Sequence, residues 1–348
     1  MLDFSNTSIR LMQVHRVGNK FENQGLRLSV DFTDTTDERV QESLIKLFFS
    51  PFKNPEYFQF ANDATFDNHP MYRYSTEIFS APGEQMKKQG EFIANLLYDV
   101  SEHPSIKPGD LCVVYFGHVG SDGRHSDALG IYKIEHLDTF LKFAQEPESY
   151  TVTALEGLGL DKLDKACLIL NQDPETGYKV CCADRSGRVQ DAMYWKDDFL
   201  ALVPRADDYH FTEQAVNLTK DFVTKQLSEE YEISKADQIA LLNRSAEYFK
   251  SQDHFNEDEF AQNIFQDPGV IDSFQRFVNK NEEENGFSFT EDFDISEAAV
   301  KKNSKVFKSV LKLDKNFHIY IHGNRNMIER GTDENGKKFY KLYYDVEI

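Results

Sequence analysis

The fold is decided by DLCVVYFGHV at residues 110–119, GSDGRHSD at 120–127 and ALGIYKIE at 128–135. The two outer runs are apolar and rich in β-branched and aromatic residues, which favour strands, and the polar segment between them is typical of a hairpin loop. The chain repeats this arrangement at 166–171 (ACLILN) and 178–186 (YKVCCADRS), around a turn rich in Asp, Pro and Gly. Because hairpins join antiparallel strands, these residues predict a largely antiparallel sheet.

The residues before the first hairpin add further strands and helices to this sheet. SIRLMQVHRV (8–17) and LRLSVDF (26–32) are predicted strands, and 37–49 and 84–100 are predicted helices. The residues expected on the apolar faces of the two helices are Val40, Leu44, Leu47 and Phe48, and Phe92, Ile93, Leu96, Leu97 and Val100. Since helices lie between hairpins, and do not follow every strand, the predicted class is α+β.

From about residue 205 the pattern becomes helical. Residues 211–227 carry an apolar stripe at helical spacing, and Ser234 with Asp237 forms a capping-box variant that opens the next helix. At the C-terminus GTDENGKK (331–338) is a predicted turn between two strands of a β-hairpin. We therefore expect two domains: an N-terminal α+β domain over 1–204, and a helical C-terminal domain over 205–348 that ends in a basic helix and a β-hairpin.

Charge and composition exclude several classes of protein. The 348 residues contain 39 Lys and Arg against 59 Asp and Glu, a net charge of −20 that repels nucleic acid and anionic membranes at long range. No apolar run approaches the roughly 18 residues of a membrane span, and the first residues lack a secretory signal. We expect a cytoplasmic protein without membrane partners, whose four cysteines are reduced and mostly buried.

The sign of the charge reverses late in the chain. Residues 229–297 hold 18 Asp and Glu against 5 Lys and Arg, a net of −13, whereas residues 298–328 hold 7 Lys and Arg against a single Asp, a net of +6. If 296–313 is one helix, four lysines share a face and suit a phosphate backbone; a solvated face that balances the acidic neighbour remains the alternative. The predicted nucleic-acid contacts are Lys301, Lys305, Lys308, Lys312 and Arg325, with Lys337 and Lys338 at the periphery.

Two further groups of residues could hold a metal ion. The predicted hairpin loop contains two histidines and two aspartates, and the predicted strand HIYIH (318–322) places His318, Tyr320 and His322 on one side. The alternative for the first group is an ordinary polar loop, and the alternative for the second is a half-exposed strand. The loop residues are His118, Asp122, His125 and Asp127. The chain has no GxGxxG, P-loop, HExxH, GxSxG or EF-hand motif, so we predict no cofactor, no metal and no catalytic residue.

Several segments in order resemble one family. They are LRLSVDFTDTTDERVQESLIKLFF (26–49), KPGDLCVVYFGHV (107–119), DALGIYKIE (127–135), YHFTEQAVNLTKDFVTKQL (209–227) and MIERGTDENGKKFYKLYYDVEI (327–348). This series resembles the bacterial nucleoid-associated protein family, often called NdpA or YejK-like, and the resemblance is sharpest at IERGTDENGKKFYKLYY (328–344). It implies a cytosolic bacterial protein of the nucleoid that binds or organises nucleic acid, directly or through partners. It implies no catalytic residues.

Three hypotheses follow from these observations. The first is a non-enzymatic nucleoid-associated protein that binds DNA weakly and without sequence specificity through its C-terminal basic surface, with RNA as an open alternative. The second is an acidic adaptor that binds a basic DNA-processing protein through residues 229–297. The third is a metal-dependent nuclease that uses His118 and His125. A homodimer is compatible with the aromatic content of the chain.

Overall fold

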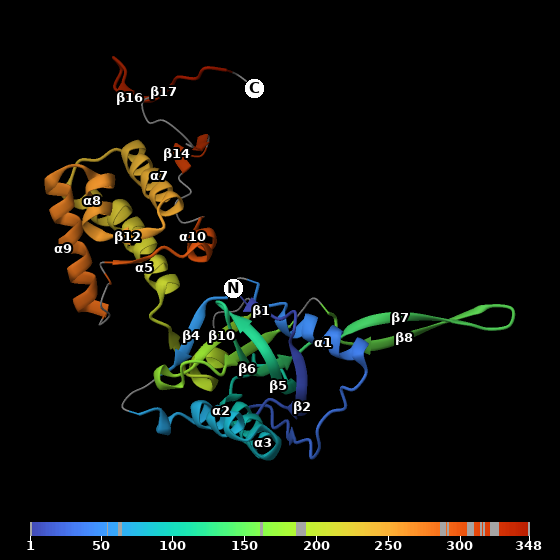
Figure 1. The fold of residues 1–348 in the computed structure, drawn as a ribbon. Coiled ribbons are helices and arrows are strands. Elements are labelled where there is room, and N and C mark those ends of the chain that lie inside the picture. The colour runs from blue at the N-terminus through green and yellow to red at the C-terminus, as the bar shows by residue number, and fades with distance from the viewer. Residues whose placement is uncertain are drawn as a thin grey trace. The chain divides into compact units, whose positions relative to one another are not determined.

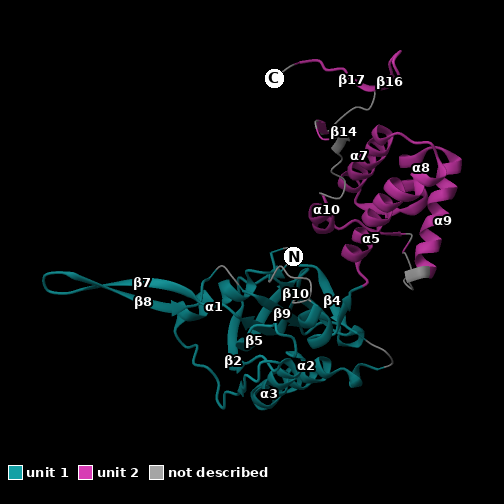
Figure 2. Cartoon of the chain, turned by 180° about the vertical axis from the view of Figure 1, so that it is seen from behind, with its two compact units in different colours: residues 1–205 teal, residues 206–348 magenta. Residues whose placement is uncertain are grey.

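The protein divides into two compact units, Met1–Arg205 and Ala206–Ile348 (Figure 2). The computed structural model describes residues 2–53, 55–61, 65–160, 163–185, 193–285, 290, 292–304, 310–313, 315, 317–320 and 327–346. That residues 1–204 and 205–348 fold as independent domains stays a prediction.

Unit 1 is built on a nine-stranded antiparallel sheet (Figure 1). Its strands follow the order β11-β4-β10-β9-β6-β5-β2-β3, and β1 also pairs with β5. The strands are β1 (Leu2–Asp3), β2 (Ser8–Val17), β3 (Leu26–Arg27), β4 (Tyr57–Phe60), β5 (Gly109–Ser121), β6 (Arg124–Ile134), β9 (Lys165–Leu170), β10 (Lys179–Asp184) and β11 (Leu202–Pro204). The two predicted hairpins are β5-β6 and β9-β10, and the predicted α+β class is confirmed.

Helices cover both faces of this sheet. Successive residues of β5 alternate between two cores: Val113 packs with side chains of α2 (Pro70–Ser80) and α3 (Pro82–Val100), whereas Val114 packs with those of α1 (Glu38–Phe49). Burial on both faces explains why the strand is apolar at consecutive positions rather than at alternate ones. The same burial raises the pKa of the Cys112 thiol to about 12, as expected for an inert core cysteine.

The helices and one strand of unit 1 differ in detail from the sequence prediction. Val40 and Phe92, which were predicted on buried faces, are exposed. In α1 the fully buried side chains belong to its last turn, Leu47 to Phe49, so the first turn carries Val40 away from the core. The second predicted strand is also shorter, because β3 ends at Arg27. Unit 1 further contains η1 (Phe66–Asn68), η2 (Pro174–Thr176) and a π-helix, η3 (Tyr194–Phe199).

A long hairpin projects from unit 1 in both views (Figures 1 and 2). It consists of β7 (Asp138–Gln145) and β8 (Tyr150–Gly157), which pair with each other in a separate two-stranded sheet. The sequence analysis did not predict these strands. We call this element the arm.

Unit 2 is mainly helical and surrounds a core rich in phenylalanine. Its elements are α5 (Asp208–Asp221), η4 (Phe222–Gln226), α6 (Leu227–Glu230), α7 (Lys235–Ser251), β12 (His254–Asn256), α8 (Glu257–Phe265), α9 (Pro268–Asn285), β13 (Asp292–Asp294), α10 (Glu297–Asn303), β14 (Val310–Leu313), β15 (Phe317–Tyr320), β16 (Ile328–Thr332) and β17 (Lys338–Leu342). Ser234 caps α7 as predicted, because its Oγ accepts a hydrogen bond of 3.1 Å from the Asp237 amide. Within the described parts of the chain, no helix is both long and apolar enough to cross a bilayer.

Candidate nucleic-acid interface

The predicted basic helix is shorter in the structure than in the prediction. Helix α10 begins after Ser296, whose Oγ accepts a hydrogen bond of 3.4 Å from the Ala299 amide, and it ends at Asn303. Its charges suit the helix dipole, since Glu297 lies in the first turn and Lys301 and Lys302 lie in the last. The helix therefore brings two adjacent lysines to its C-terminal end.

The two lysines of α10 differ in their surroundings. The Lys301 side chain is 77% exposed, and its Nζ lies 3.1 Å from the Glu297 carboxylate one turn earlier. The Lys302 side chain instead lies against α5, with its Nζ 3.5 Å from Glu213 and 5.4 Å from the ring centroid of Tyr209. Exposed ion pairs contribute only about 0–1 kcal/mol, so a phosphate can compete with Glu297 for Lys301.

Lys312 does not share a helical face with Lys301, and this part of the prediction is wrong. Lys312 lies in strand β14, where it pairs with His318 of β15. Residues 310–313 form a short, mostly apolar run, and they precede a polar segment and a second apolar run, so hairpin pairing prevails there over helix propagation. Lys305, Lys308 and Arg325, the other predicted contacts in this segment, lie outside the described residues.

The predicted C-terminal hairpin is present as β16 and β17. Asp333 closes its turn, because its carboxylate accepts hydrogen bonds of 2.9 Å from the Asn335 amide and 2.8 Å from the Lys337 amide. Gly336 has a φ of +78°, a left-handed conformation that glycine adopts without strain. The turn presents Lys337 and Lys338, both predicted contacts, as exposed side chains.

Cations and aromatic rings are interspersed along this hairpin. One face pairs Arg330 with Tyr340, and the opposite face carries Phe339 and Lys341. The pKa of Lys341 is raised by its contacts with Tyr343 and Glu329, so this side chain stays cationic at neutral pH. Rings that stack on bases beside cations that contact phosphates are typical of surfaces that bind single strands. The sequence analysis missed these aromatic residues, although KKFYKLYY (337–344) carries the signal.

The histidine and aspartate residues of the β5-β6 loop do not form a metal site in the structure. Lys179 donates a hydrogen bond to Asp122, and Asp127 accepts one of 2.7 Å from the Tyr115 hydroxyl. The two carboxylates are thus already bound to protein groups. The described residues contain no group of three or more His, Cys, Asp or Glu side chains placed to hold a metal ion. His318 of the second candidate lies in β15, and His322 falls outside the described residues.

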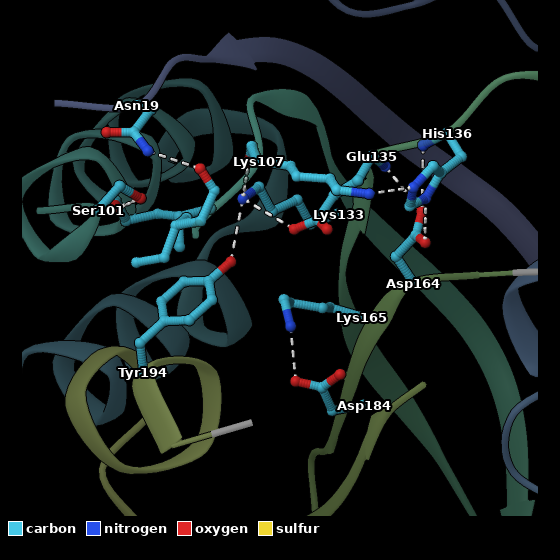
Figure 3. Close-up of polar contacts among 12 residues, drawn as sticks. Asn19, Ser101, Lys107, Lys133, Glu135, His136, Asp164, Lys165, Asp184 and Tyr194 are labelled. Carbon is cyan, nitrogen blue, oxygen red and sulfur yellow. Dashed lines mark hydrogen bonds and ion pairs between the residues drawn. The ribbon is translucent and has the colours of Figure 1, made fainter. Parts of the chain in front are cut away.

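Unit 1 holds a second cluster of charges, which is buried (Figure 3). Lys133 of β6 and Lys165 of β9 lie opposite each other in the sheet with almost no exposed surface. Lys133 Nζ donates hydrogen bonds to the Lys107 carbonyl oxygen at 2.6 Å and to the Tyr194 hydroxyl at 2.9 Å, and it lies 3.0 Å from the Glu135 carboxylate. Burial lowers the pKa of Lys133, and Glu135 offsets part of this shift.

The two buried lysines already have protein partners, so this cluster does not suit a phosphate ligand. Lys165 Nζ lies 2.6 Å from the Asp184 carboxylate, so each lysine has an acidic partner. The neighbouring pocket, with a volume of about 610 Å³, is lined by Tyr194 and by three acidic side chains, those of Asp99, Glu102 and Asp198. Lys20 pairs with Asp99 and Glu102, but these side chains together still carry a net negative charge that opposes phosphate, so the cationic segment of unit 2 is the better candidate for contact with nucleic acid.

Comparison with known protein families shows to which family this chain belongs. The family described as nucleoid-associated protein YejK matches residues 14–337. The chain belongs to this family. The match extends through most of both units, so it supports the resemblance drawn from the sequence and associates the protein with the bacterial nucleoid. No curated protein matches the chain.

Proposed function

We propose that this protein binds DNA weakly and without sequence specificity through its C-terminal cationic segment, and that it does so without catalysing a reaction. Family membership supports a role at the nucleoid. The observation that carries the choice of surface is the reversal of charge, from a net of −13 over residues 229–297 to +6 over residues 298–328. A strongly acidic protein needs such a local cationic surface to approach a phosphate backbone.

The terminal hairpin supports contact with single strands as well as with duplex DNA. Its exposed cations can neutralise phosphates, and the exposed rings of Phe339 and Tyr344 can stack on unpaired bases, whereas Lys341 Nζ already lies 5.1 Å from the ring centroid of Tyr343. Such contacts do not read the edges of base pairs, so binding is expected to be independent of sequence. RNA offers the same phosphates and base faces, and we expect it to compete with single-stranded DNA.

The salt dependence of binding tests this proposal. Contact with four phosphates gives a slope of about −3.6 in log K against log salt, which is a loss of about 150-fold between 50 and 200 mM salt. Fluorescence anisotropy of the full chain with labelled duplex DNA, single-stranded DNA and RNA measures the slope directly. Saturable binding at low salt with a slope near this value supports the proposal.

Charge reversal then locates the surface. We expect the fourfold Lys→Glu variant at 301, 305, 308 and 312 to lose DNA binding while its circular dichroism spectrum stays that of the folded protein. A matched control reverses four cations elsewhere in unit 2, Lys225, Lys235, Arg244 and Lys250, all of them exposed. The control changes the net charge by the same amount, so equal losses in both variants would mean that general repulsion, and not this segment, governs binding. Unchanged affinity in the first variant would remove its lysines from the interface.

An adaptor function is the second candidate, and a specific observation favours it. Residues 229–297 carry the net charge of −13, and Asp258 and Glu259 at the start of α8 are exposed. A basic DNA-processing protein would be attracted to such a surface. Absence of DNA binding even at low salt, together with basic partners that remain bound after nuclease treatment of a pull-down, would favour the adaptor over direct contact with DNA.

A further inference from the structure

The arm exposes an apolar face that nothing in the described structure covers. In an antiparallel hairpin, directly opposite residues share a face, and the register pairs Leu141 with Ala154 and Phe143 with Val152. Tyr150 extends the same face toward the tip, opposite Gln145. Leu141 is 65% exposed, Phe143 67% and Tyr150 67%. The other face pairs Phe140 with Leu155 near the base of the arm, and Lys142 with Thr153 and Ala144 with Thr151 toward the tip, so only its outer part is more polar.

An arm of this kind needs a partner. A single two-stranded hairpin is marginally stable at best in water, and a third strand or a packed apolar face is needed to hold it. Here β7 and β8 pair only with each other among the described strands, so the hairpin gains no support from the large sheet. The apolar face is therefore a surface for association.

The charges of the arm argue against DNA as this partner. Residues 138–157 contain four acidic side chains, Asp138, Glu146, Glu148 and Glu156, against the single cation Lys142. β-Ribbons that enter a groove of DNA must approach the phosphates on both sides, and a net charge of −3 opposes this approach. The occupant that suits the surface is a protein.

We propose that the occupant is a second copy of this chain, and that two arms pack their apolar faces against each other. The positions that meet in this packing, 141, 143, 150, 152 and 154, carry no charge, and the one charged residue of this face, Glu156, lies outside them near the base of the arm. Each arm strand spans eight residues, or about 27 Å, which is roughly three Debye lengths at physiological salt. The arm can thus join two chains of net charge −20 while the repulsion between their bodies is screened.

The size of the apolar face is sufficient for a specific dimer. Covering Leu141, Phe143, Tyr150 and Val152 on both copies buries roughly 1,000 Å² in total, which reaches the lower limit for specific interfaces. The face mixes large side chains with the small Ala154, a combination that allows two sheets to interdigitate at a separation of about 10 Å. A symmetric contact also closes on itself, so it yields dimers and not filaments.

The mass of the full chain in solution tests the proposal. Size-exclusion chromatography with light scattering, at protein concentrations of tens of micromolar, should give twice the monomer mass. The double variant Leu141→Glu and Phe143→Glu should give the monomer mass. The control Thr151→Glu and Thr153→Glu adds the same two charges to the opposite face of the same arm and should stay dimeric. A monomeric wild type, or a dimer that survives the first variant, would overturn the proposal.

A cross-linking variant guards against misreading a loss of folding. Val152→Cys places a thiol on the apolar face, and we expect a bismaleimide with a span of about 10 Å to link two copies through it, whereas Thr153→Cys on the other face should not be linked. Three of the natural cysteines are buried and Cys182 is half-buried, so they should not interfere. Equal cross-linking of the two variants would count against face-to-face packing.

Discussion

Lys133 shows how a single side chain can determine the stability of unit 1. Its ammonium group and the Glu135 carboxylate are both buried, and removing one partner leaves the other charge without compensation. We expect Lys133→Met to lower the free energy of unfolding by about 3–5 kcal/mol. Denaturant titration followed by the fluorescence of Trp195 measures this, because Trp195 is the only tryptophan and is buried in unit 1.

A surface lysine provides the control for this measurement. Lys20 lies 2.9 Å from Glu102 and 3.2 Å from Asp99, but all three side chains are partly exposed. Lys20→Met should therefore cost no more than about 1 kcal/mol. Similar losses for the two variants would show that Lys133 is hydrated in solution.

His15 makes the stability of unit 1 sensitive to acid. Burial lowers the pKa of its imidazole below the ordinary value of 6.5, so the unfolded chain binds a proton that the folded chain does not. We expect the free energy of unfolding to fall as the pH is lowered from about 6.5 toward the folded pKa. In His15→Gln the difference between unfolding at pH 7 and at pH 5 should be smaller. An unchanged difference would assign the acid sensitivity to other groups.

At the scale of elements, the short pairing of β12 with β13 has the opposite pH dependence. His254 lies between two acidic side chains, and the hydrogen bond to Asp294, followed by that to Asp292, raises the pKa of the imidazole. Because the folded pKa is raised, protonated His254 stabilises the pairing fully below about pH 6.5. This contribution is lost as the pH rises through the folded pKa. An NMR titration should place the pKa of His254 above 6.5, and Asp294→Asn should lower it. A wild-type pKa at or below 6.5 would contradict the contacts seen here.

The elements differ in how far the sequence could predict them. β5 and β6 were predictable because apolar runs with β-branched residues flank a polar loop. The arm carries a similar signal, with apolar residues on both sides of the polar EPES (146–149), but its apolar residues face solvent in the monomer and no core of the same chain explains them. The predicted basic helix is too long because lysines at 301, 305, 308 and 312 fit helical spacing, whereas pairing of two short apolar runs in a hairpin decides the structure from residue 310.

At the scale of the whole molecule, the two units should be separable in function. If DNA binding belongs to unit 2 and association to the arm, residues 206–348 alone should bind DNA as monomers, and residues 1–205 alone should dimerise without binding DNA. Fluorescence anisotropy measures the DNA binding of each fragment, and light scattering measures its mass. The fluorescence of Trp195, which is buried in the folded protein, shows whether unit 1 is folded. DNA binding by residues 1–205 would contradict the proposal, because it would place the nucleic-acid interface in unit 1.

The charge distribution along the chain could be predicted from the sequence, but the partners of the individual charged residues could not. Counting residues locates the positive segment at 298–328, whereas partners such as Glu297 for Lys301 and Glu213 for Lys302 depend on how α10 packs. The buried lysines of unit 1 were equally hidden, because Lys133 is distant in sequence from Tyr194. Pairing across such separations is a property of the fold and cannot be inferred from local spacing.

Two chains joined through their arms would present two cationic segments in one assembly. The second segment then meets DNA as an intramolecular event, and its effective concentration can raise the avidity by about 10²–10⁴ over that of one segment. Weak contacts of one chain would thereby become durable bridges between distant DNA sites. Dilution of the protein below the dissociation constant of the dimer would release the DNA, although the contacts between each chain and DNA would not change.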